Sequence, residues 1–197
     1  MKELLGAKYL SYISSLTNTR WILPVGGFRG IYYVLDPEER QKKTFKLSKF
    51  QILIIVLDRI LDGDWYFGRI TALHLHGAIH QPVSTHYILN QKYSRKVRSK
   101  MLGELVFVKT SGNINKHSGI ITMAYKGRPY NLSTIERTIT DYIYLYLHGH
   151  TSRTALIKLQ NSVHFDKNKL VRIISAGYPK YDAKRMHSLI EHRTVVR

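Results

Sequence analysis

The chain has 197 residues, which is the length of one domain or of a small domain joined to a medium one, and 44% of them are hydrophobic. It has no cysteine, and this excludes a disulfide scaffold, a thiolate zinc site and a cysteine nucleophile. The formal net charge of +18 favours a polyanionic partner, because Lys and Arg side chains release the counterions of a nucleic acid when they bind it. An acidic protein would be attracted by the same positive charge.

Residues 7–19 are predicted to form a helix, because apolar side chains recur in this segment at helical spacing. We expect one buried face made of Tyr9, Leu10, Ile13 and Leu16. The opposite face is polar and carries no acidic residue, so it suits contact with DNA.

Residues 20–35 contain two runs of apolar, β-branched and aromatic residues, 21–25 and 30–35, joined by Gly26-Gly27-Phe28-Arg29. This pattern predicts a hairpin with a basic tip. A polar helix followed by such a hairpin is typical of the C-terminal half of a winged helix-turn-helix, whose helix enters the major groove while the wing touches the backbone or minor groove. A complete winged helix has a further helix ahead of this pair, so we expect a truncated module.

The DNA contacts expected in this head are hydroxyl, amide and phenol groups that meet base edges and cations that meet phosphates. They are Lys8, Tyr12, Ser14, Ser15, Asn18, Arg20 and Arg29. The alternative is an amphipathic helix and hairpin that pack on the larger domain and leave an ordinary solvated face.

Residues 36–43 are charged, contain a proline and lack apolar side chains, so they are predicted to be a linker between a head at 1–40 and a second domain at 41–197. In the second domain we expect a helix at 46–61 and a short strand and helix at 64–77. Further strands are expected at 85–90, 104–110 and 120–125 with 130–132. The polar segment 91–100 is predicted to be a connection. The fold class is therefore α+β, with a small, mainly antiparallel sheet.

The same polar segment contains the densest basic cluster of the chain, made of Lys92, Arg95, Lys96, Arg98 and Lys100. These cations contact phosphate, hold an acidic protein, or belong to a solvated loop. A smaller basic patch, Lys180, Lys184 and Arg185, lies near the end of the chain.

Residues 130–149 are predicted to be the central core helix, with Ser133 as N-cap and Glu136 closing a capping box. Arg137 and Asp141 are four residues apart and are expected to pair on its flank. Three helices at 151–162, 166–176 and 183–192 are expected to form a helical C-terminal tail.

The sequence gives few starting points for catalysis. Glu136 and Asp141 lie about 140° apart around the helix axis, so they cannot converge on one substrate. The histidines in H-x-H spacing point apart on a helix, and no Cys, Asp or Glu near them completes a metal site. No glycine-rich phosphate loop is present. We therefore expect no catalytic residue, no metal and no cofactor.

No segment has the length and apolarity of a membrane span. The longest apolar run, residues 52–57, is far too short to cross a bilayer, and residues 1–15 lack the apolar core of a signal peptide. We expect a cytoplasmic protein without a membrane partner.

Three segments in order resemble one protein family. They are RWILPVGGFRGIYYVL at 20–35, YFGRITALHLHG at 66–77, and LSTIERTITD at 132–141, which carries an S-x-x-E-R-T-x-x-D pattern. The chain resembles the antitoxin and transcriptional-regulator family of the AbiE type IV toxin–antitoxin systems (AbiEi-like) over about residues 7–145. The resemblance implies a winged helix that binds double-stranded operator DNA, and a C-terminal domain that counteracts a nucleotidyltransferase-like toxin. The family signature positions Glu136, Arg137 and Asp141 are assigned to fold maintenance.

The resulting hypothesis is a DNA-binding transcriptional regulator with antitoxin-type activity and no catalysis of its own. A DNA-acting enzyme is the alternative, either a nuclease or a base-removing enzyme with a restriction role. A third hypothesis is a non-enzymatic protein whose basic cluster at 92–100 binds an acidic partner.

Overall fold

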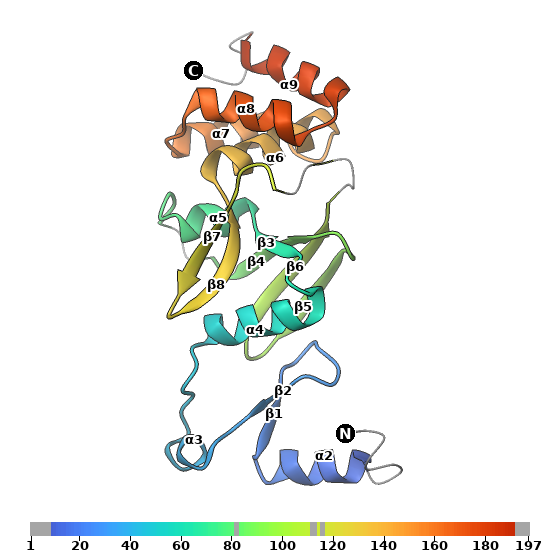
Figure 1. Cartoon of the computed structure of the whole chain (residues 1–197), viewed down its shortest axis with the longest axis vertical. Helices are drawn as coiled ribbons and strands as arrows, with labels where there is room; N and C mark the ends of the chain where they lie inside the picture. Colours follow the sequence, from blue (N-terminus) through green and yellow to red (C-terminus); the bar gives the residue numbers. More distant parts are fainter. Residues whose placement is uncertain (1–8, 81–82, 111–113, 115–116, 192–197) are drawn as a thin grey trace.

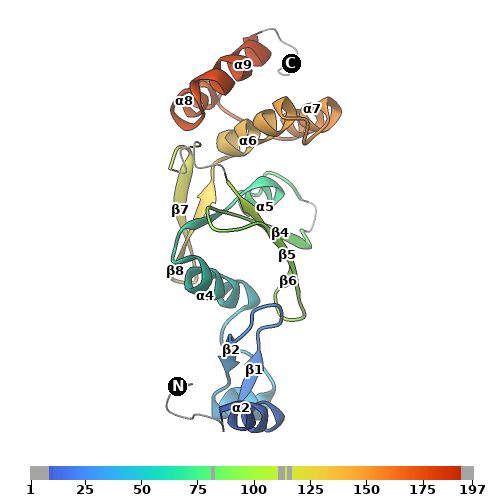
Figure 2. The same ribbon diagram turned by 90° about the vertical axis from the view of Figure 1, so that its right-hand side faces the viewer.

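The computed structural model describes residues 9–80, 83–110, 114 and 117–191. The protein is elongated, and three parts follow one another along its length (Figure 1, Figure 2). We call them the head (residues 9–45), the sheet part (46–133) and the helical part (134–191). The mixed α and β composition agrees with the predicted fold class.

In the head, helix α2 (Tyr9–Asn18) leads into strands β1 (Ile22–Pro24) and β2 (Tyr32–Val34), which pair antiparallel. Helix α3 (Pro37–Lys42) follows, within the segment predicted to be a linker. That prediction missed the helix. Asp36 and Glu39 form a capping box, in which each side chain accepts a hydrogen bond from the backbone N–H of the other.

The expected burial of the apolar face of α2 is contradicted, because no residue of this helix is buried. Leu10 is 75% exposed and Leu16 is 38% exposed, whereas Tyr9 and Ile13 are half-buried. The helix contacts the short β1 strand, which is too small to cover the whole face. Periodicity identified the apolar side of the helix correctly but could not show how much of it is covered.

The sheet part contains one large sheet with the strand order β5-β6-β4-β3-β8-β7. Its strands are β3 (Trp65–Phe67), β4 (Thr85–Asn90), β5 (Arg95–Ser99), β6 (Gly103–Lys109), β7 (Ile120–Tyr125) and β8 (Arg128–Ser133). The β4–β6 and β3–β8 pairs are parallel, and the other three pairs are antiparallel. The sheet is thus mixed and larger than the small, mainly antiparallel sheet that was predicted.

Strand β5 accounts for much of this difference, because its residues were predicted to be a polar connection. It is an edge strand in which only Val97 and Ser99 are buried. Because its exposed positions are Lys and Arg, the alternation of buried and exposed side chains that marks a strand is not recognisable in the sequence. Strand β6 lies between β4 and β5. It runs antiparallel to β5 and parallel to β4.

One hydrophobic core joins the sheet to helix α4 (Lys49–Leu61). It includes Leu57, Phe67 and Phe107 from the sheet part, and also Val25 and Phe28 from the loop between β1 and β2. The head therefore contributes two buried side chains to the core of the sheet part.

A second core lies among helix α5 (Arg69–Leu75) and the helices of the helical part. These are α6 (Ile135–Leu147), α7 (Arg153–Ser162), α8 (Lys167–Gly177) and α9 (Lys180–Glu191). They gather at the opposite end of the molecule from α2 (Figure 1). The helices predicted from periodicity are present, with ends that differ by a few residues.

The start of α6 differs from the prediction. Thr134 is the N-cap, and its hydroxyl accepts a hydrogen bond from the Arg137 backbone N–H at 3.2 Å. Ser133 is instead the last residue of β8, and its hydroxyl lies 3.3 Å from the Phe67 carbonyl. Glu136 closes no capping box. Its carboxylate accepts the Asp166 N–H at 3.3 Å and pairs with Lys169 Nζ at 3.1 Å, so it holds the start of α8.

Arg137 is the largest fully buried side chain of the described residues, with 1% exposure. Its Nε donates to Asp141 Oδ1 at 3.0 Å, which confirms the predicted pair but places it in the interior rather than on a flank. Its Nη1 donates to the Ser118 carbonyl at 2.7 Å. The Tyr178 hydroxyl donates to the same Asp141 oxygen, so α6, α8 and the segment before β7 meet around one guanidinium.

We predict that Arg137→Leu lowers the free energy of unfolding by about 3–5 kcal/mol, because Asp141 would remain buried without its cation. Urea denaturation measures this change. The double variant Arg137→Leu/Asp141→Leu should recover part of the loss. Arg59→Leu, at an exposed position of α4, should change the free energy by no more than about 0.5 kcal/mol. Equal effects at Arg137 and Arg59 would contradict a central role for the buried pair.

Candidate nucleic-acid interface

Helix α2 presents its polar side to solvent. Ser14, Ser15 and Asn18 are exposed, and Tyr12 is 50% exposed. The helix carries no acidic residue, and Arg20 follows it as an exposed side chain. Lys8, which was also predicted to contact DNA from this helix, lies outside the described residues. The structure thus brings five of the predicted contacts together on and beside one helix.

The C-terminal end of α2 is fixed to the rest of the head by Arg40. Its guanidinium lies 3.8 Å from the centre of the Trp21 ring, and Nη2 donates to the Thr19 carbonyl at 2.9 Å. Arg40 could not be predicted to have this role, because it lies in the predicted linker, 19 positions after Trp21, and no local sequence pattern connects the two residues.

The hairpin tip does not stand free as a wing. Phe28 is buried and packs edge-on against Phe107, with ring centres 6.1 Å apart. Arg95 Nη2 donates to the Gly27 carbonyl at 2.8 Å. A Cβ on Gly27 would lie 2.2 Å from Val97 Cγ1, so only glycine allows this close approach to β5. The tip is an anchor, and Arg29 remains exposed beside it.

The basic cluster of residues 92–100 does not form one free surface. Lys92 pairs with Asp62 at the end of α4, and Arg95 is engaged with the hairpin tip. Lys96 and Arg98 both pair with Glu104 of β6, at 2.8 and 3.1 Å. These four predicted contacts therefore have three different neighbours, Asp62, Gly27 and Glu104, and their charge is partly balanced inside the protein.

The acidic residues of the head are also balanced. Lys42 pairs with Glu38, Lys46 pairs with both Asp36 and Glu38, and Glu39 is buried. Burial and the Glu39 carboxylate raise the pKa of Tyr33 to about 12, so Tyr33 stays neutral and donates to Glu39. Residues 9–45 contain five Lys and Arg against three Asp and Glu, so most of the +18 charge lies outside the head.

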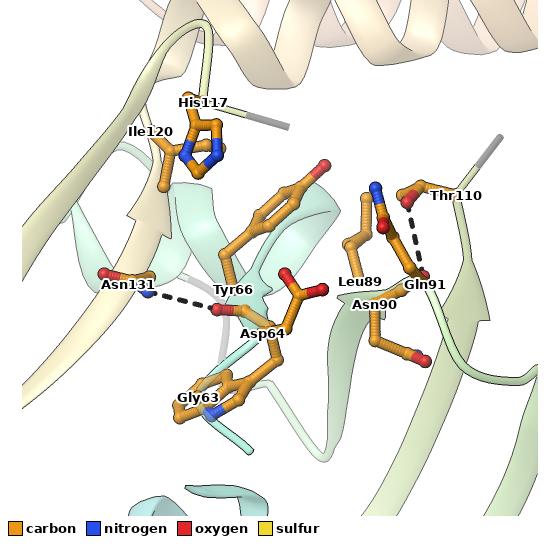
Figure 3. Close-up of a pocket in the computed structure, with 11 residues that line it drawn as sticks. Gly63, Asp64, Tyr66, Leu89, Asn90, Gln91, Thr110, His117, Ile120 and Asn131 are labelled. Carbon is orange, nitrogen blue, oxygen red and sulfur yellow. Dashed lines mark hydrogen bonds between the residues drawn. The ribbon is translucent and has the colours of Figure 1, made fainter. Parts of the chain in front are cut away.

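A small polar cavity of about 80 Å³ lies at the end of the sheet where β3 begins and β4 ends (Figure 3). Asp64 is the one carboxylate among the described residues that line it, beside Tyr66, Gln91 and His117. Several of the polar groups that line it have hydrogen-bond partners within the protein. Asn131 donates to the Trp65 carbonyl, and Thr110 donates to the Asn90 carbonyl. The described part of the chain contains no group of three or more His, Cys, Asp or Glu side chains that could hold a metal ion.

No protein-family model matches this sequence, and no curated protein is similar to it. Within the described ranges, every helix is too short or too polar to cross a bilayer.

We predict that Glu104 makes folding stability depend on pH in the acid range. Lys96, the Thr85 hydroxyl and Arg98 lower its pKa from the ordinary 4.5 to about 2. A carboxyl whose pKa is lowered by folding stabilises the protein above its unfolded pKa, and this stability is lost as the pH falls from about 4.5 to about 2.

Urea unfolding of the wild type and of Glu104→Gln over this pH range tests the prediction. The variant should lose less stability than the wild type as the pH falls. The double variant Lys96→Gln/Arg98→Gln should also lose less stability over this pH range, because it lacks the cations that lower the pKa of Glu104. Parallel pH curves for all three proteins would contradict the assignment.

Proposed function

We propose that this protein is a cytoplasmic DNA-binding transcriptional regulator with antitoxin-type activity against a nucleotidyltransferase-like toxin, and that α2 is its DNA-reading helix. The observation that carries the DNA-binding part is the exposed polar side of α2, which has no acidic residue and is held at its end by Arg40.

The dimensions and chemistry of α2 suit the major groove. An α-helix with its side chains is about 10–12 Å wide, and the major groove of B-DNA is about 12 Å wide. An asparagine pairs well with the edge of adenine, and serine hydroxyls bond to several base edges. Asn18, Ser14 and Ser15 are therefore assigned to base contact, with Tyr12 beside them.

Cations near the end of α2 are assigned to the flanking phosphates. Arg20, Arg40 and Lys43 line one hollow of about 190 Å³ in the head. Phosphate contacts of this kind fix the orientation of a reading helix without carrying sequence information. Because the hairpin tip is anchored to β5, the phosphate contact of this loop is assigned to Arg29 alone.

The antitoxin part of the proposal rests on the resemblance of residues 20–35, 66–77 and 132–141 to AbiE-type antitoxins. In this assignment the sheet and helical parts counteract the toxin, and the head regulates transcription.

We predict that Asn18→Ala weakens binding to the duplex upstream of the protein's own gene by about 1–3 kcal/mol, the value of one good contact to a base edge. Fluorescence anisotropy with this duplex and with a shuffled duplex of equal length measures the change. The shuffled duplex should be affected much less, because Asn18 contacts bases rather than phosphates. Asn161→Ala, the same change at an exposed position of α7, is the matched control and should have no effect.

Binding should also weaken steeply as salt increases, because phosphate contacts release counterions. Unchanged binding by Asn18→Ala, or equal losses on both duplexes, would contradict base reading by α2. Point variants are needed for this test. Deletion of the head would also remove Val25 and Phe28 from the shared core.

We predict that a nucleotidyltransferase is encoded beside this gene, and that co-expression of this chain rescues growth of cells that express it. Asn18→Ala should rescue equally well, since α2 is assigned to DNA and not to the toxin. Absence of rescue by the wild type would contradict the antitoxin part and leave the DNA assignment standing. Strand breaks or abasic sites in plasmid incubated with the protein, with or without a divalent metal, would contradict the non-catalytic assignment.

A further inference from the structure

Helix α9 carries a line of exposed polar and aromatic side chains at the end of the molecule opposite the head (Figure 1). We call it the α9 stripe; it consists of Lys180, Tyr181, Lys184, Arg185 and Ser188. Their spacing of one, three, one and three residues places all five on one face of the helix. The other face is in the core, where Ala183 and Met186 are buried.

None of the ion pairs in the part of the chain that the structure describes involves Lys180, Lys184 or Arg185. Asp182 lies on the buried side of the helix and is 3.3 Å from His148 Nε2. Lys180 and Lys184 are four residues apart, and like charges at this spacing destabilise a helix. The contrast with β5 is clear, because there Glu104 balances Lys96 and Arg98. Among the side chains that the structure describes, the α9 stripe is thus a cationic surface without an ion pair.

Tyr181 gives this surface a second chemical property. Its side chain is 73% exposed, and the Arg185 guanidinium lies 5.5 Å from its ring centre. An exposed aromatic ring beside cations is how proteins bind single-stranded nucleic acids: the bases stack on the ring and the phosphates meet Lys and Arg. In a duplex the base faces are covered by neighbouring pairs, so such a ring is of little use there.

We infer that the α9 stripe is a binding site for single-stranded nucleic acid, separate from the duplex-reading surface proposed for α2. An unpaired base stacks on Tyr181, and Lys180, Lys184 and Arg185 contact the adjacent phosphates. The shallow hollows on both sides of Lys184, lined by Ser175 and His187 on one side and by Leu147 and Leu189 on the other, give the strand room to follow the helix. An acidic protein segment would use the same cations but has no need of the exposed ring.

The test measures binding of the full-length chain to labelled oligouridine, oligothymidine and a duplex of equal length by fluorescence anisotropy. The wild type should bind both single strands more tightly than the duplex, which carries no operator sequence. Tyr181→Ala should weaken single-strand binding about tenfold or more, the effect of losing one stacked base, whereas Tyr181→Phe should bind normally. Comparison of oligouridine with oligothymidine shows which of the two is the preferred ligand. Oligodeoxyuridine, which differs from oligouridine only in lacking the 2′-hydroxyl, shows whether that hydroxyl contributes.

Charge variants distinguish binding at the α9 stripe from non-specific attraction by the net positive charge of the protein. Lys184→Gln/Arg185→Gln should weaken single-strand binding strongly. Lys158→Gln/Arg172→Gln removes the same charge from exposed positions of α7 and α8 and should have a much smaller effect. Asn18→Ala should leave single-strand binding unchanged, so the two nucleic-acid proposals fail independently.

Three results would overturn the inference. The first is equal binding by Tyr181→Ala and the wild type. The second is duplex binding as tight as single-strand binding. The third is displacement of oligouridine by polyglutamate as readily as by unlabelled oligouridine, which would assign the α9 stripe to an acidic protein.

Discussion

The close packing of the hairpin tip against β5 fixes the head to the sheet part. Gly27 approaches Val97 so closely that any side chain at this position would collide, and Phe28 is buried against Phe107. Arg95 adds a hydrogen bond to the Gly27 carbonyl. The head is consequently anchored through its loop, and α2, at the far end of the hairpin, is left with its polar side in solvent (Figure 2). This geometry supports the proposal that α2, and not the tip, reads DNA.

The buried Arg137 has a corresponding role in the other half of the molecule. Through Asp141, Tyr178 and the Ser118 carbonyl it connects α6, α8 and the segment before β7. Its neighbour Glu136 holds the start of α8 through Asp166 and Lys169. These contacts hold α6 and α8 in place against the sheet part. The S-x-x-E-R-T-x-x-D segment therefore supports the fold, as the sequence analysis expected, although Ser133 and Glu136 have other neighbours than a capping box provides.

Local signals in the sequence were sufficient for most helices and insufficient for the contacts between distant segments. A strongly apolar run predicted α4, although it did not show that Ser48 is the N-cap, and apolar periodicity predicted the three C-terminal helices. Strand β5 was missed because an exposed edge rich in Arg and Lys resembles a loop. The anchoring of the tip was missed because Gly27 and Arg95 are 68 residues apart, and the pattern of a basic hairpin is the same whether its tip is free or packed.

The central claim, that α2 lies in the DNA groove while the tip is anchored, is tested most directly by cleavage from a tethered iron chelate. The chain has no cysteine, so Ser15→Cys and Thr122→Cys each provide a single attachment site, on α2 and on the exposed β7 strand. The account predicts cuts at defined positions of the upstream duplex from residue 15 and none above background from residue 122. Cuts from residue 122 alone, or no cuts from residue 15 on a duplex that is bound, would contradict it.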